Sequence, residues 1–149
     1  MKRMVTGLAL LIAAAGPAGA EQAASLTIHV ENVDVRGGIL RLGLYDKAQY
    51  DKDDDNPLAA ADVTAQPGET IVTLKNLKPG IYAIEVFQDL NGNGKMDFSW
   101  LGLPEEPYGF SRDAHPVLSQ PSFARAAFLL DPGENLQTLH LQGPVHAKP

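Results

Sequence analysis

The chain has 149 residues and no cysteine, so disulfide bridges, thiolate metal sites and thiol nucleophiles are excluded. Its 18 acidic residues outnumber its 12 basic ones, and this balance argues against nucleic acid as a partner. The length suits a single domain with one core.

The first twenty residues, MKRMVTGLALLIAAAGPAGA, have the features of a secretory signal peptide. Lys2 and Arg3 precede an apolar run, and small residues lead up to Ala20, where we expect cleavage. Residues 21–149 would then form a single domain in the bacterial periplasm or outside the cell. Because the leader removes two basic residues, the net charge of this domain is 10 − 18 = −8. No segment is long and apolar enough to predict a membrane span.

Several segments alternate apolar and polar residues, which is the pattern of half-buried β-strands. The first two are 26–30 and 40–44, and Gly37-Gly38 between them predicts a hairpin turn. Further strands are expected around 72–74, 82–86, 126–130 and 139–141. Residues 57–62, PLAAAD, allow a short helix.

This pattern predicts an all-β fold. We expect an antiparallel β-sandwich, Ig-like or transthyretin-like, with about seven strands and one long functional loop. Two segments, 46–66 and 89–122, are expected to lack strands, and loops of that length in a compact domain usually carry function or are disordered.

The nine residues DLNGNGKMD have oxygen-bearing groups at the spacing of an EF-hand loop. Calcium takes about six to eight oxygens, and such a loop supplies them from positions 1, 3, 5, 7, 9 and 12. The first five of these ligands would be, in order, Asp89, Asn91, Asn93, the Lys95 carbonyl and Asp97. The alternative is a Gly-rich turn whose aspartates are solvated or bonded to backbone amides.

Position 12 of this loop is Trp100, where a bidentate glutamate is expected. A ligand from elsewhere is therefore needed, and Glu105 is the candidate in the same loop. Glu106, Asp113 and the acidic stretch 51–55 are alternatives. Without such a ligand we expect a weak calcium site.

Four of the chain's ten aromatic residues fall within the thirteen residues from Phe98 to Phe110. Trp100, Tyr108 and Phe110 would form a stacking platform for a sugar or another flat ligand. The alternative is that these aromatics pin the long loop to the sandwich as a small core of its own.

Three stretches, LKPGIYAIEVFQDLNGNGKMD, LGLPEEPYGFS and PSFARAAFLL, occur in that order, and with them the chain resembles the secreted bacterial family called domain of unknown function 2141. The resemblance implies one exported β-sandwich domain and brings no established activity. The chain departs from the family pattern at Arg112, where an asparagine usually follows the serine. Residues 77–82, LKPGIY, are also similar to the strand entry of transthyretin-like and carboxypeptidase-regulatory-like sandwich modules.

The histidines and carboxylates do not form a recognisable catalytic motif. His29 and His140 are expected on the outward faces of strands, and only His115 falls in the long loop. We therefore expect the protein not to be an enzyme.

The favoured function is a calcium-stabilised, non-catalytic binding or adaptor module, monomeric, whose partner is an unknown extracytoplasmic protein or a small ligand. The alternative is a metal-independent module that binds through the aromatic loop 98–110. A hydrolase using the loop acids with His115 is a third hypothesis.

Overall fold

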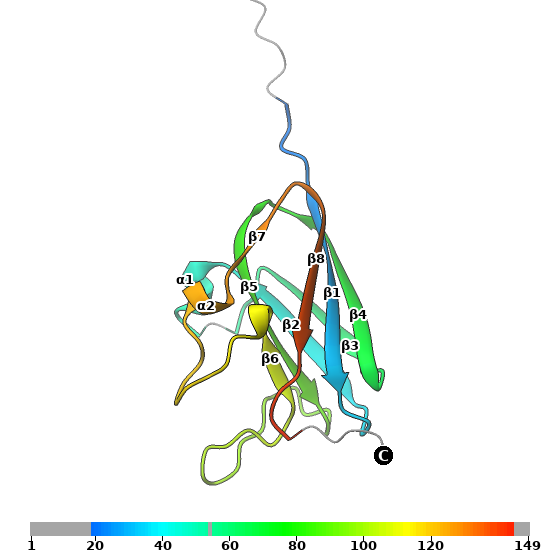
Figure 1. Cartoon of the computed structure of the whole chain (residues 1–149), viewed down its shortest axis with the longest axis vertical. Coiled ribbons are helices and arrows are strands. Elements are labelled where there is room, and N and C mark those ends of the chain that lie inside the picture. The colour runs from blue at the N-terminus through cyan, green and yellow to red at the C-terminus, as the bar shows by residue number, and fades with distance from the viewer. Residues whose placement is uncertain (1–18, 54, 145–149) are drawn as a thin grey trace, which may run out of the picture.

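Eight strands form two β-sheets in the part of the chain that the computed structural model describes, residues 19–53 and 55–144 (Figure 1). The predicted signal peptide lies outside these residues except for Gly19 and Ala20. The predicted all-β sandwich is confirmed. Within the described residues, no helix is of a length and apolarity that would carry it through a bilayer.

The first sheet, called sheet 1, has the order β4-β1-β8, and the second, sheet 2, has the order β3-β2-β5-β6. β7 pairs with the start of β5. The strand bounds are β1 Ala24–Val33, β2 Ile39–Tyr45, β3 Ala59–Thr64, β4 Gly68–Leu77, β5 Gly80–Asp89, β6 Tyr108–Phe110, β7 Phe128–Leu130 and β8 Gly133–His140. Among these strands every pairing is antiparallel except that of β1 with β8, which is parallel.

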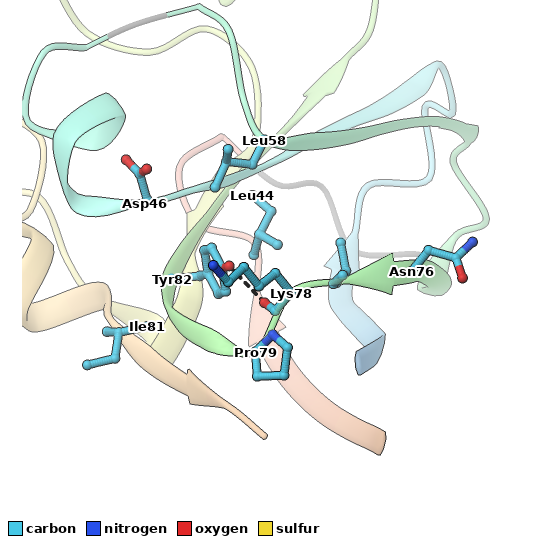
Figure 2. Close-up of a pocket in the computed structure, with 9 residues that line it drawn as sticks. Leu44, Asp46, Leu58, Asn76, Lys78, Pro79, Ile81 and Tyr82 are labelled. Carbon is cyan, nitrogen blue, oxygen red and sulfur yellow. Dashed lines mark hydrogen bonds between the residues drawn. The ribbon is translucent and has the colours of Figure 1, made fainter. Parts of the chain in front are cut away.

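The turn from β4 to β5 joins the two sheets and is fixed by a tyrosine (Figure 2). The Tyr82 hydroxyl donates a hydrogen bond of 2.8 Å to the Lys78 carbonyl, four residues upstream. A tyrosine that bonds back to the backbone at a strand entry is the tyrosine corner of Greek-key sandwiches. The LKPGIY sequence at 77–82 therefore has a structural role at this turn.

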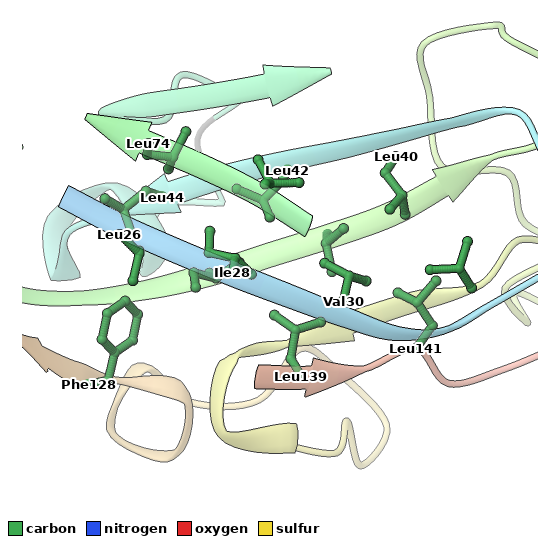
Figure 3. Close-up of a cluster of buried hydrophobic side chains, with 14 of the residues drawn as sticks. Leu26, Ile28, Val30, Leu40, Leu42, Leu44, Leu74, Phe128, Leu139 and Leu141 are labelled. Carbon is green, nitrogen blue, oxygen red and sulfur yellow. The ribbon is translucent and has the colours of Figure 1, made fainter. Parts of the chain in front are cut away.

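The core lies between the two sheets and consists of the inward-facing residues of each strand (Figure 3). Leu26, Ile28 and Val30 of β1 are fully buried, and they face the buried leucines of β2 and the aliphatic residues of β5. Fully burying a side chain of this size contributes about 1.5–3 kcal/mol. The period of two in the sequence thus predicts the buried face of these strands correctly.

The predicted hairpin between the first two strands is wrong, because β1 and β2 lie in different sheets. The chain crosses from one sheet to the other after Val33 and enters β2 at Ile39. Gly38 has a φ of +87°, and a Cβ there would overlap the Asp89 carbonyl oxygen. The two glycines therefore lie in the connection between the two sheets, and Gly38 allows a close approach to the end of β5. They do not form the primed turn that the sequence pattern predicts.

The helix allowed for 57–62 is also wrong, because residues 59–62 belong to strand β3, which pairs antiparallel with β2. Ala59, Ala61 and Val63 pack against the core, and the residues between them are exposed. An alanine on the exposed face hides the alternation, so the pattern is invisible in the sequence. The segments expected to lack strands also contain short elements: α1 Lys47–Tyr50, β6, and the 3-10 helix η1 Ser111–Asp113.

A second, smaller cluster covers part of the outer face of sheet 2. Tyr50 of α1 and Phe123 of α2, Phe123–Ala126, pack over Ala83 of β5 with their rings 5.6 Å apart. The Tyr50 hydroxyl donates to the Pro121 carbonyl at 2.9 Å. The long segment after β6 is therefore held on the sandwich by its own side chains.

Candidate metal-binding loop

The DLNGNGKMD loop begins at the last residue of β5 and lies at the end of the sandwich opposite the β4–β5 turn (Figure 1). Because β5 pairs with β2 from Ala83 to Asp89, the end of β5 is held by backbone hydrogen bonds of sheet 2. Asp89 is thus fixed, whereas residues 91–95 are exposed.

Asp89 is fully buried, and its carboxylate accepts three hydrogen bonds. The amides of Gly92 and Gly94 donate to Oδ1 and Oδ2 at 2.8 Å each, and the Arg41 Nε donates to Oδ2 at 2.7 Å. Burial alone would raise the pKa of Asp89, but the hydrogen bonds from Arg41 and from the two amides outweigh it, so the pKa lies below its usual value. This carboxylate is therefore charged at neutral pH.

The side chains of Asn91, Asn93 and Asp97 converge in the exposed half of the loop. The Asn91 Nδ2 lies 2.7 Å from Asp97 Oδ2, and the Asn93 Nδ2 lies 2.9 and 3.0 Å from the two Asp97 oxygens. Each asparagine Oδ1 also accepts a backbone N–H two residues ahead, from Asn93 and from Lys95. Positive φ angles at Gly92 and Gly94, +72° and +78°, allow this tight path.

Glu106 closes the base of the loop. Its buried carboxylate accepts from the Leu90 amide at 2.8 Å and from the Asp97 amide at 3.1 Å. Glu105, the ligand expected from the sequence, is exposed, and its backbone N–H donates to the Asp97 carbonyl at 2.9 Å. Of the two adjacent glutamates, Glu106 is the one whose carboxylate is directed at the loop.

The oxygens of the loop fit a hard cation only loosely. A carboxylate offers about four lone-pair sites, so Asp89 keeps one after its three hydrogen bonds, and each asparagine oxygen keeps one of two. The charge of Asp89 is already balanced by Arg41, which leaves the carboxylates of Asp97 and Glu106 as the sources of negative charge at the loop. Within the described residues, no group of three or more histidine and carboxylate side chains is placed to hold a metal. Such a site would be weak.

The predicted ligand platform is divided in the structure. Tyr108 and Phe110 lie half-buried on β6 with their rings 6.2 Å apart, whereas Trp100 is 92% exposed. Trp100 lies in a short hairpin, residues 98–103, in which Ser99 and Leu103 bond through their backbones at 2.8 Å. Its exposed apolar residues, here called the hairpin tip, are Phe98, Trp100, Leu101 and Leu103.

The structure reveals a histidine between two carboxylates, at a position where the strand pattern predicts an outward-facing residue. The ring of His140 lies 2.8 Å from Asp113 through Nδ1 and 3.0 Å from Glu31 through Nε2. The hydrogen bond to Asp113 raises the pKa of His140; burial opposes this, and the charges of both carboxylates add to it. His115 instead lies 2.5 Å from Gln142. Because Glu31 and Asp113 lie far from His140 in the sequence, no short motif predicts that these three side chains meet.

A shallow pocket of about 520 Å³ lies at the start of β5 (Figure 2). Leu44, Leu58 and Tyr82 are among the apolar side chains that line it, and Asp46 and Lys78 are its charged residues. The pocket surrounds the tyrosine corner at the end of the sandwich away from the loop.

The fold and the loop together define a small β-sandwich with a Gly-rich, oxygen-lined loop at one end. The chain belongs to the family described as an uncharacterized protein conserved in bacteria, DUF2141, whose model matches residues 28–138. The resemblance read from the sequence is confirmed. No curated protein and no solved structure matches the chain.

Proposed function

We propose that this protein is an exported, calcium-stabilised binding module without catalytic activity. The observation that carries the proposal is the convergence of Asn91, Asn93 and Asp97, whose side-chain ends lie 2.7–3.0 Å apart. Calcium requires oxygens that meet at one point of a loop with glycine at its sharp turn. The atoms that face Asp97 here are the two asparagine Nδ2 groups, so on binding calcium each asparagine would turn its Oδ1 to this point. A cation there would replace the asparagine amides as partner of the Asp97 carboxylate.

Calcium would act on an exposed part of the chain. Exposed residues 91–95 have their side-chain contacts within the loop, and the hairpin tip follows directly from Asp97. A bound cation would fix the direction in which the tip projects. The tip would then contact an apolar surface on an extracytoplasmic protein or a small ligand.

Calcium titration of the metal-free protein tests the proposal. We expect a dissociation constant near 1 mM, at the weak end of extracellular calcium modules. At 10 mM calcium such a site adds about 1.4 kcal/mol to the free energy of unfolding, or about 5 °C in melting temperature. Trp100 is the only tryptophan, so excitation of this residue should sensitise terbium emission from the loop.

The matched variants are Asp97→Asn and Glu134→Gln. Each removes one negative charge, but Glu134 is an exposed residue of β8 outside the loop. We expect Asp97→Asn to abolish the calcium effect and Glu134→Gln to preserve it. Absence of both binding heat and a rise in melting temperature at millimolar calcium would refute the proposal.

A second candidate is a metal-independent module that binds through the same hairpin tip. The exposure of Trp100, 92%, favours it, because a tryptophan that packs against nothing is uncommon on a soluble surface. Trp100→Ala should then abolish ligand or partner binding with or without calcium and change the stability by less than about 0.5 kcal/mol. Global unfolding of this variant would instead assign the aromatic side chain to packing.

A further inference from the structure

The position-1 aspartate of the loop already has a cation as its partner. Arg41 extends from the outer face of β2, where it lies opposite Asp62 of β3. Its Nε contacts the buried Asp89 at 2.7 Å, and its Nη1 contacts Asp62 at 2.6 Å. The arginine side chain is 23% exposed, so water screens this pair only in part.

We propose that Arg41 is a resident cation that sets the calcium affinity of the loop by competing for Asp89. The inference rests on the proposed function, because it concerns the same loop. Calcium bound to the free side of the Asp89 carboxylate would lie a few ångströms from the guanidinium group. Two positive charges that close repel each other, most strongly where one of them is shielded from solvent.

The arginine also explains how the loop keeps its shape without metal. A buried carboxylate with no positive partner is strongly destabilising. Arg41 removes that penalty in the metal-free protein, because it already neutralises Asp89. Calcium is then a second cation at this carboxylate, and its binding is weak. Asp62, which already pairs with the guanidinium, would remain its partner when calcium takes Asp89.

Calcium titration of Arg41→Gln tests the inference. We expect this variant to melt at a lower temperature than the wild type without metal, because Asp89 loses its partner. Its calcium affinity should rise at least tenfold, and calcium should restore the melting temperature. A purely structural role for Arg41 would lower stability without tightening calcium binding.

Two further variants separate charge from packing. Arg41→Lys keeps the positive charge, so its calcium affinity should stay within about threefold of the wild type. Arg36→Gln is the matched control, because Arg36 pairs with the buried carboxylate of Asp34 at 2.8–2.9 Å outside the loop. It should lose stability in the same way and show no gain in calcium affinity.

The outcomes distinguish the inference from the proposed function. If the wild type binds calcium and Arg41→Gln binds it no more tightly, the inference is overturned and the proposed function stands. If only Arg41→Gln binds, the inference is supported and calcium is removed from the function of the native protein. If no variant binds at 10 mM calcium, both are overturned.

Should Arg41→Gln be unfolded without metal, both proteins are titrated in enough osmolyte to fold them, because calcium that must also refold a chain shows an affinity lower than that of the site. A dissociation constant at least tenfold below that of the wild type in the same osmolyte supports the inference. A smaller gain, or none, overturns it.

Discussion

Three buried carboxylates organise the loop end of the sandwich, each by a different set of donors. Asp34 pairs with Arg36, Asp89 pairs with Arg41 and two amides, and Glu106 accepts two backbone amides. A buried charge is tolerated only when such partners surround it, since removing one partner typically costs about 3–5 kcal/mol. These three side chains therefore fix the path of the loops at this end of the sandwich.

Glu85 is a half-buried carboxylate of β5, and the groups of the described chain that shift its pKa include no positive charge. It accepts a hydrogen bond from the Gln120 Nε2 at 2.6 Å. Burial, with the charges of Asp53 and Asp55 adding to it, raises its pKa from 4.5 to about 7. Between those two pH values the folded protein holds a proton that the unfolded chain has lost. Its contribution therefore makes stability fall as the pH rises through this window.

Glu85→Gln should therefore stabilise the protein only at high pH, where Glu85 is charged in the wild type. At pH 8 we expect the free energy of unfolding to rise by about 2 kcal/mol, because the variant has no charge to bury. At pH 4.5 or below the difference should be close to zero. Urea denaturation at the two pH values measures it, and an equal effect at both would contradict the assigned pKa.

At the scale of the elements, the sequence predicts well which face of a strand is buried and poorly which strands pair with one another. The alternation at 26–30 and 40–44 identifies two strands correctly, because one face of each is buried. It cannot tell that these strands pack face to face in different sheets. β3 is missed because alanine occupies its exposed as well as its buried positions.

The loop shows the same limit at finer detail. Its ligand spacing is visible in the sequence because the residues are neighbours, and the structure brings Asn91, Asn93 and Asp97 together. The roles of Arg41 and Glu106 cannot be read locally. Arg41 lies 48 residues from its partner Asp89, and nothing in the pair Glu105-Glu106 indicates which carboxylate turns inward.

Glu106→Gln should loosen the base of the loop. The neutral amide keeps one accepting oxygen in place of two charged ones, so the Leu90 or the Asp97 amide loses its acceptor. We expect amide hydrogen exchange at these two positions to accelerate about tenfold or more, equivalent to about 1.4 kcal/mol of lost protection. Glu105→Gln, an exposed neighbour with the same charge change, should leave both rates unaltered. Equal rates in the two variants would show that the loop is held by other contacts.

At the scale of the whole molecule, the third strand of sheet 1 comes from the far end of the described chain. β1 lies between β4 and β8, and residues of β1 and β8 that are partners are about 109 positions apart, as in Ala24 and Gly133, since 133 − 24 = 109. Periodicity in the sequence carries no information on such a pairing. Leu139 of β8 and Leu141 after it complete the core beside Val30 (Figure 3).

Leu139→Ala should therefore destabilise the whole domain. The side chain is fully buried, and leucine-to-alanine changes in cores cost about 2–5 kcal/mol. Leu136→Ala is the control on the same strand, because Leu136 is 62% exposed, and it should cost less than about 0.5 kcal/mol. Chemical denaturation of both variants measures the difference. Similar losses would mean that β8 contributes by pairing alone.

The parallel pairing of β1 with β8 also bears on the order in which the protein is made. β1 emerges from the ribosome early, yet its last neighbour in the sheet is synthesised 109 residues later. At about 5–20 residues per second, that delay is about 5–20 s. Throughout this interval the nascent chain has a central strand with at least one vacant side, a state open to chaperones and to any channel that threads extended polypeptide.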